Sequence, residues 1–121
     1  MASVVETLRR RAFAYPGAYE DHPWGESVAK VDGKVFAFFG MADDRGRHTG
    51  FTVKLPASSE GALMLPFVES TGYGLGPSGW VTVRPPEDWP VDPFMDWLDE
   101  SYRAVAKKAR IAELDANRAP R

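Results

Sequence analysis

The sequence contains no cysteine, and only two of its 121 residues are histidines. The absence of cysteine excludes disulfides, thiolate nucleophiles and metal sites built from sulfur ligands. The histidines, His22 and His48, are not joined to each other or to carboxylates by a spacing typical of metal-binding motifs. We therefore expect neither a metal nor another cofactor.

The chain also lacks a long apolar run and an excess of positive charge. No stretch approaches the roughly 20 apolar residues that cross a bilayer, and Arg9-Arg10-Arg11 is not followed by the apolar segment of a signal peptide. We expect a cytoplasmic protein without membrane contact. The net charge of −2 disfavours strong non-specific binding to nucleic acid, because phosphate neutralisation supplies much of that affinity. A DNA-binding protein of this composition needs a local basic patch.

An apolar content of 44% in 121 residues is sufficient for one domain with a real core. We expect a single domain over residues 1–121, with residues 115–121 as a frayed tail. Ser3 and Glu6 form a capping-box pattern that predicts a helix over residues 4–14. Asp92 and Pro93 are typical of a second helix start, and the apolar spacing predicts one unbroken helix over residues 93–114.

The middle of the chain has the patterns of an antiparallel sheet. The dipeptide Asp32-Gly33 predicts a type I′ turn between strands 26–31 and 34–39, with Val31 beside Lys34 and Ala29 beside Phe36. Further predicted elements are strands over residues 51–55 and 80–84, a short helix over 58–65 and a short strand near Tyr73. This order predicts a two-layer α+β fold, in which helices cover one face of an antiparallel sheet of about four to five strands.

The glycine-rich segment over residues 72–79 contains a nominal dinucleotide-binding pattern at Gly74, Gly76 and Gly79. A strand is predicted after it, whereas the dinucleotide motif requires a helix N-terminus at that point. We therefore interpret the segment as a turn that leads into the strand over residues 80–84.

The loop over residues 20–24 combines carboxylates, an imidazole and an indole. Asp21, His22 and Trp24 are candidates for binding a small ligand. Acid–base catalysis would require a second converging group, because adjacent residues of an extended segment point apart. A structural role in capping and turn formation is the favoured interpretation, and no residue is assigned as catalytic.

Alternation in the strands over residues 51–55 and 80–84 separates an inward set from an outward set of side chains. The inward set is Phe51, Val53, Leu55, Val81 and Val83. The outward set is Thr52, Lys54, Trp80, Thr82 and Arg84, with Lys30 of the hairpin as a further candidate. An indole with cations on one surface can bind a nucleotide or another anion. In the alternative, Trp80 covers the sheet edge and the cations only protect the surface from aggregation.

The second half of the last predicted helix is basic. It carries Arg103, Lys107, Lys108 and Arg110. These side chains could contact phosphates. Acids near a helix start and bases near its end also complement the helix dipole, so a solvated face is the favoured alternative.

Several segments, taken together and in order, resemble the MmcQ/YjbR family of small bacterial proteins. They are Tyr15-Pro16-Gly17, residues 20–25, residues 31–36, Val53-Lys54-Leu55-Pro56, Gly74-Leu75-Gly76, Gly79-Trp80-Val81 and residues 101–106. The resemblance implies a CyaY-like, or secretion-chaperone-like, α+β fold and double-wing DNA binding, and it carries over no catalytic residues. Related sequences tend to have a proline before the two lysines, whereas this chain continues directly into Lys107-Lys108.

Several functions therefore stay open. The first is a non-enzymatic binding module, with DNA as the partner that the resemblance implies, present as a monomer or a weak homodimer. The second is a protein-interaction or chaperone-like adaptor, and the third is a small-ligand binder that uses the loop over residues 20–24. Iron handling, by analogy with the CyaY-like fold, ranks last, because the acids over residues 92–100 lie around a helix rather than along one line.

Overall fold

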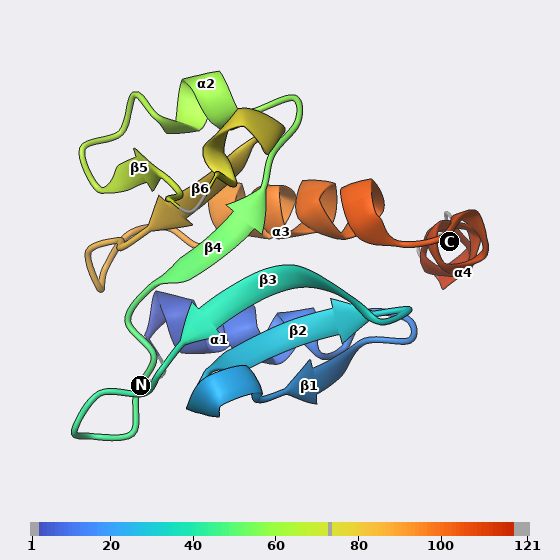
Figure 1. The fold of residues 1–121 in the computed structure, drawn as a ribbon, viewed down its shortest axis with the longest axis horizontal. Helices are drawn as coiled ribbons and strands as arrows, with labels where there is room; N and C mark the ends of the chain where they lie inside the picture. Colours follow the sequence, from blue (N-terminus) through green and yellow to red (C-terminus); the bar gives the residue numbers. More distant parts are fainter. Residues whose placement is uncertain (1–2, 73, 118–121) are drawn as a thin grey trace.

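The computed structural model describes residues 3–72 and 74–117, which form an α+β fold (Figure 1). The six strands make one antiparallel sheet in the order β1-β2-β3-β4-β6-β5. The elements are α1 (Val4–Ala12), β1 (Tyr19–Asp21), η1 (Pro23–Gly25), β2 (Ser27–Val31), β3 (Lys34–Gly40), β4 (Phe51–Lys54), α2 (Ser59–Ala62), β5 (Val68–Ser70), η2 (Gly76–Ser78), β6 (Trp80–Val83), α3 (Asp92–Val105) and α4 (Lys108–Asn117).

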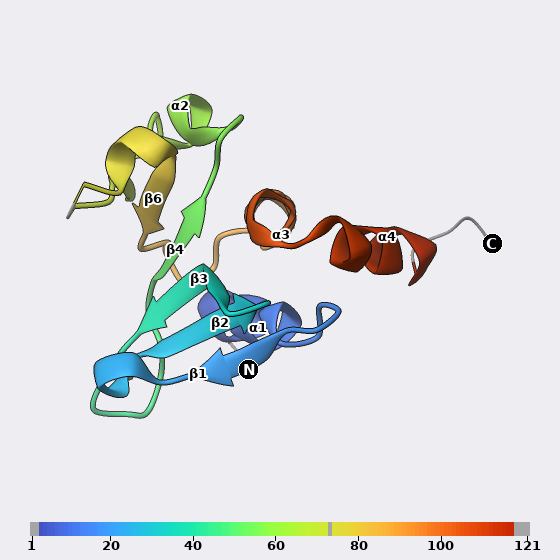
Figure 2. The same ribbon diagram turned by 45° about the vertical axis from the view of Figure 1, so that its right-hand side comes forward.

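The two-layer arrangement confirms the fold class predicted from the sequence. Helices α1 and α3 lie on the same side of the sheet, and α3 packs across β3 and β4 (Figures 1 and 2). The sheet has more strands than the expected four to five, because the sequence patterns did not predict β1 and β5, which have only three residues each. Such short strands are too brief to produce a recognisable alternation. The predicted strand near Tyr73 falls on a residue outside the described part of the chain.

The hairpin between β2 and β3 contains the predicted turn and two unpredicted bulges. Asp32 has φ 53° and Gly33 has φ 80°, as a type I′ turn requires. Val31 pairs with Lys34 as expected, but Ala29 pairs with Ala37 instead of Phe36. Register shifts leave Phe36 and Phe39 as extra residues in β3. Because each bulge adds a residue and bends the strand, Phe36, Ala37 and Phe39 all reach the helical side.

The core lies between the sheet and the helices α1 and α3. All five residues of the predicted inward set are at most 2% exposed, which confirms the alternation. Phe36 packs against Tyr102 of α3 with ring centroids 5.1 Å apart, and against Tyr15 at 5.9 Å. The apolar stripe of α1 is buried in the same cluster. This arrangement leaves the opposite face of the sheet without a covering helix among the described elements.

Helix α1 begins where the sequence predicts. The Ser3 hydroxyl accepts a hydrogen bond from the Glu6 amide at 3.1 Å, as an N-cap should. The Glu6 carboxylate accepts from the backbone amide of His48 at 2.8 Å. It therefore ties the 41–50 loop to α1, a role different from the reciprocal half of a capping box.

The prediction of one unbroken helix over residues 93–114 is wrong. Helix α3 ends at Val105, Ala106 is extended with φ −70° and ψ 151°, and α4 begins at Lys108. Asp32 of the hairpin turn explains the break, because its carboxylate accepts from the Lys107 amide at 3.4 Å and from Arg110 Nε at 3.3 Å. Residues 115–117 belong to α4, whereas the rest of the expected tail lies outside the described residues.

The glycine-rich segment forms a turn followed by a strand, as predicted. Helix η2 ends at Gly79, which has φ 92°, and β6 begins at the next residue. The structure therefore has no helix at the position that a dinucleotide phosphate would require. Among the residues that the structure describes, no helix is long and apolar enough to cross a bilayer.

Candidate binding site on the outer face of the sheet

The face of the sheet opposite α1 and α3, here called the outer face, carries a row of hydroxyl groups. Thr52 and Thr82 are cross-strand neighbours, and their Oγ1 atoms are 3.1 Å apart. Thr71 Oγ1 lies 3.0 Å from the same Thr82 oxygen. Because the three hydroxyls bond to one another, they are largely satisfied within the protein and form a less polar floor than free hydroxyls would.

Two aromatic side chains extend this floor. Phe38 is the register partner of Thr52, and its ring packs edge-on against Trp80 with centroids 5.4 Å apart. Lys54 lies opposite Trp80 on the neighbouring strand. The structure thus places Trp80 on the outer face with Thr52, Lys54 and Thr82, as the alternation predicts.

A concave cavity of about 450 Å³ lies on the outer face where β3 and β4 separate. These strands pair only at Ala37–Val53 and Phe38–Thr52, and beyond Phe38 the two strands diverge. Figure 2 shows strands β1, β2 and β3 at an angle to strands β4 and β6. The lining residues include Glu26, Phe38, Met41, Thr52, Leu75 and Arg84.

One exposed apolar side chain lines this cavity, and a second belongs to the turn directly before Glu26. Met41, which lines it, is 69% exposed. Trp24 of η1 is 92% exposed and has a positive φ of 58°, and Glu26, two residues later, lines the cavity. A bulky residue in the left-handed region is uncommon and persists only where the surrounding structure holds it. Here Gly25 N and Glu26 N donate to the carbonyls of residues 22 and 23, which fixes the turn.

Two of the cations near the outer face are paired with carboxylates. Arg84 Nη1 binds Glu69 Oε1 at 2.7 Å, and both side chains are exposed. Lys30 Nζ binds Asp21 Oδ2 at 2.6 Å on the adjacent strands. The hydrogen bond between them lowers the pKa of Asp21 and raises that of Lys30.

The cations predicted on the last helix do not form a patch with those of the sheet. Arg103 binds Asp99 at 2.7 Å and Asp115 at 2.6 Å, and these bonds raise its pKa. Arg110 binds Asp32. Lys107 and Lys108 lie at the junction of α3 and α4, an arm that projects from the helical side of the sheet (Figure 2). The structure therefore places Lys54 and Trp80 together at one end of β4 and β6 and Arg84 beyond the other end of β6, and it leaves the basic end of the chain apart from all three.

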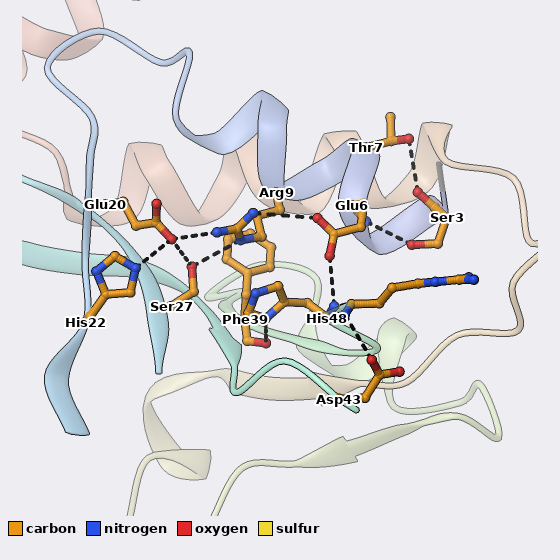
Figure 3. Close-up of polar contacts among 11 residues, drawn as sticks. Ser3, Glu6, Thr7, Arg9, Glu20, His22, Ser27, Phe39, Asp43 and His48 are labelled. Atoms are coloured by element: carbon orange, nitrogen blue, oxygen red, sulfur yellow. Dashed lines mark hydrogen bonds and ion pairs between the residues drawn. The ribbon is translucent and has the colours of Figure 1, made fainter. Parts of the chain in front are cut away.

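The loop over residues 20–24 is organised around one carboxylate (Figure 3). Glu20 Oε2 accepts from Arg9 Nη2 at 2.6 Å and from Ser27 Oγ at 2.7 Å, and it lies 3.1 Å from His22 Nε2. Partial burial acts to raise the pKa of Glu20, but the bonds from Ser27 and Arg9 outweigh it, so the pKa lies below its ordinary value. Glu20 and His22 converge because they are two residues apart, on the same side of the extended segment.

The contacts of Glu20 with Arg9 and Ser27 link α1, β1 and β2, which is a structural role. A nucleophile–base–acid relay requires the imidazole to bind the hydroxyl, whereas Ser27 and His22 both contact the same oxygen of Glu20. Neither His22 nor Glu20 lines the cavity on the outer face. Among residues 3–72 and 74–117, no group of three or more His, Asp or Glu side chains is placed to hold a metal ion.

Comparison with known protein families is decisive at the level of the family. The model of the YjbR family matches residues 13–104, which begin directly after α1 and include the whole sheet and all of α3 except Val105. The chain belongs to the YjbR family. No curated protein gives a significant match to it.

Solved structures that are similar to this chain include two that share its fold. Protein DR2400 of Deinococcus radiodurans, described by its DUF419 domain, superposes with a TM-score of 0.72 at 24% identity, over 93% of this chain and 88% of that one. A protein from Pseudomonas syringae superposes with a TM-score of 0.62 at 14% identity, over 83% of this chain and 97% of that one. At these identities the likeness establishes the fold of the YjbR chain and leaves its ligand to be inferred from the site.

Proposed function

We propose that this YjbR protein is a non-enzymatic protein-interaction domain that binds a segment of a partner polypeptide on its outer face. The cavity of about 450 Å³ on the helix-free side of the sheet carries this proposal. Its size suits a few side chains of an extended segment, and its lining mixes apolar groups with satisfied hydroxyls. Exposed aromatic and methionine side chains beside a cavity are typical of interaction surfaces.

The charge distribution favours a polypeptide over duplex DNA. Affinity for DNA comes largely from cations that are free to neutralise phosphates. Four of the seven candidate cations, Lys30, Arg84, Arg103 and Arg110, are engaged in ion pairs. Of the remainder, Lys54 is on β4, whereas Lys107 and Lys108 are at the junction of α3 and α4. Double-wing DNA binding is therefore the competing hypothesis that the experiment must exclude.

The test is a selection of random linear peptides from a display library with the whole chain, followed by NMR titration of an enriched peptide. We expect chemical-shift changes to cluster at Phe38, Met41, Thr52 and Thr82. Met41→Glu and Trp24→Ala should each weaken binding roughly tenfold, as expected for contact residues at an interface. The matched control is Met64→Glu, because Met64 is 85% exposed but does not line the cavity.

Two results would overturn the proposal. One is the failure of Met41→Glu and Trp24→Ala to affect any selected peptide. The other is a combination of two observations. A 20-base-pair duplex binds in a salt-dependent way that Lys54→Gln or Lys107→Gln weakens, and the wild-type chain enriches no peptide more strongly than the Met41→Glu variant does. Salt dependence is the signature of phosphate contacts and is not expected for an apolar segment.

A further inference from the structure

One carboxylate at the cavity has no partner among the described residues. Glu26 is half-buried and lines the cavity on the side of η1. Its carboxylate makes no hydrogen bond or ion pair with any residue in the described ranges. In this respect it differs from Glu20 and Asp21 of β1 and from Glu69 of β5, which are all paired.

Among the described residues that line the cavity, the only other charged side chain is that of Arg84. Its Nη1 atom forms an ion pair with Glu69 at 2.7 Å, which balances its charge. With Glu69 included, the charges at the cavity sum to one unbalanced negative charge, that of Glu26. An acidic segment therefore meets net repulsion at this site, and a basic one meets attraction.

Desolvation strengthens this discrimination. A purely apolar segment that covers Glu26 removes water from the carboxylate without replacing its hydrogen bonds, which makes the free energy of binding less favourable. A segment with a cationic side chain at this point offsets that loss with a charge-assisted hydrogen bond. Phe38, Leu75 and the mutually bonded threonines still provide an apolar surface for the neighbouring side chain.

On the basis of the proposed function, we propose that the bound segment carries a lysine or arginine that pairs with Glu26, next to an apolar side chain that occupies the cavity. Glu26 is thus the residue that selects basic over acidic segments. The occupant is a basic–apolar stretch of polypeptide, in contrast to the anionic ligand that Lys54, Trp80 and Arg84 suggest from the sequence alone.

The test uses the same peptide display, with the wild-type chain and the Glu26→Lys variant as separate baits. We expect lysine or arginine beside an apolar residue in wild-type selections and aspartate or glutamate in Glu26→Lys selections. For one selected peptide and its analogue with lysine replaced by glutamine, Glu26→Gln should weaken binding of the first roughly fivefold. It should leave the analogue unchanged. Glu60→Gln, at an exposed carboxylate of α2, is the matched control and should bind both peptides as the wild type does.

Failure of this inference is distinguishable from failure of the proposed function. If selected peptides lose affinity in Met41→Glu but show no basic residue and no response to Glu26→Gln, the role of Glu26 is overturned and the binding face stands. If Met41→Glu binds every selected peptide as well as the wild type, both are overturned. Amide spectra of Glu26→Gln and Glu26→Lys that match the wild type outside the cavity exclude misfolding as the cause of either result.

Discussion

The Ser101 hydroxyl donates a hydrogen bond of 2.5 Å to the carbonyl oxygen of Phe36. The Ser101 hydroxyl oxygen in turn accepts a hydrogen bond from the backbone amide of Lys54 at 2.8 Å. Phe36 and Lys54 lie one step beyond the paired residues Ala37 and Val53, where β3 and β4 part. A side chain of α3 thus replaces a bond between the strands, and the sheet opens without leaving these buried backbone groups unpaired.

Ser101→Ala should therefore lower the stability strongly. The variant removes two hydrogen bonds at a site that is fully buried, which should cost about 2–4 kcal/mol of unfolding free energy. Urea denaturation followed by tryptophan fluorescence measures the loss. Ser78→Ala, at an exposed position in η2, is the control and should change stability by less than about 0.5 kcal/mol. A Ser101→Ala variant as stable as this control would contradict the bridging role.

Low pH should weaken the contacts of Glu20 with Arg9 and Ser27. Because the pKa of Glu20 is lower in the folded state, its ionised form stabilises the fold above the ordinary value of 4.5. That contribution is lost as the pH falls through the folded pKa. Glu20→Gln should cost about 1–2 kcal/mol at pH 7, and the difference from the wild type should shrink below about pH 4.5. Urea melts at pH 7 and pH 3.5 test this, and an unchanged difference at the two values would refute it.

Asp32→Asn should loosen α4 selectively. Asparagine keeps the left-handed conformation of the turn but lacks the charge that holds Arg110 and the Lys107 amide. Amide hydrogen exchange in α4 should accelerate several-fold, since helix termini without caps fray. The strands β2 and β3 should exchange at the wild-type rate. Equal protection of α4 in both proteins would mean that the burial of Leu114 alone holds the helix.

The glycine-rich segment should tolerate alanine at one position and not at another. A Cβ on Gly79 would lie 2.9 Å from the backbone oxygen of Leu55, whereas one on Gly74 would meet no atom within 4 Å. Both residues have positive φ, so each alanine variant bears a conformational cost of about 1 kcal/mol. Gly79→Ala should lose at least about 1 kcal/mol more in urea denaturation, because backbone must shift to accommodate it. Equal losses would contradict this packing.

The parts of the fold that sequence predicts are those that depend on local pattern. Alternation assigned the faces of β4 and β6, and Asp32-Gly33 assigned the hairpin turn, because each signal is contained within a few residues. The bulges at Phe36 and Phe39 were missed, since they depend on how β3 fits against α3. The break at Ala106 was missed for the same reason, because Asp32, which caps α4, lies far away in the sequence.

The site was predictable only in part. Trp80 and Thr82 were placed correctly by alternation, but Phe38 could be assigned to the outer face only once the bulges were known. Glu26 and Met41 lie in irregular segments, where no periodicity relates a residue to a face. The unbalanced charge of Glu26 is a property of its surroundings, so no local pattern could have revealed it.

The strand order leaves β1 and β5 as the two borders of the sheet, and each has only three residues. An edge strand of three residues exposes too few main-chain donors and acceptors for a strand of another molecule to pair along it. Fibrillar stacking through these margins is correspondingly disfavoured. The exposed indole and methionine can therefore remain accessible to a partner without an adjacent long edge that would promote aggregation.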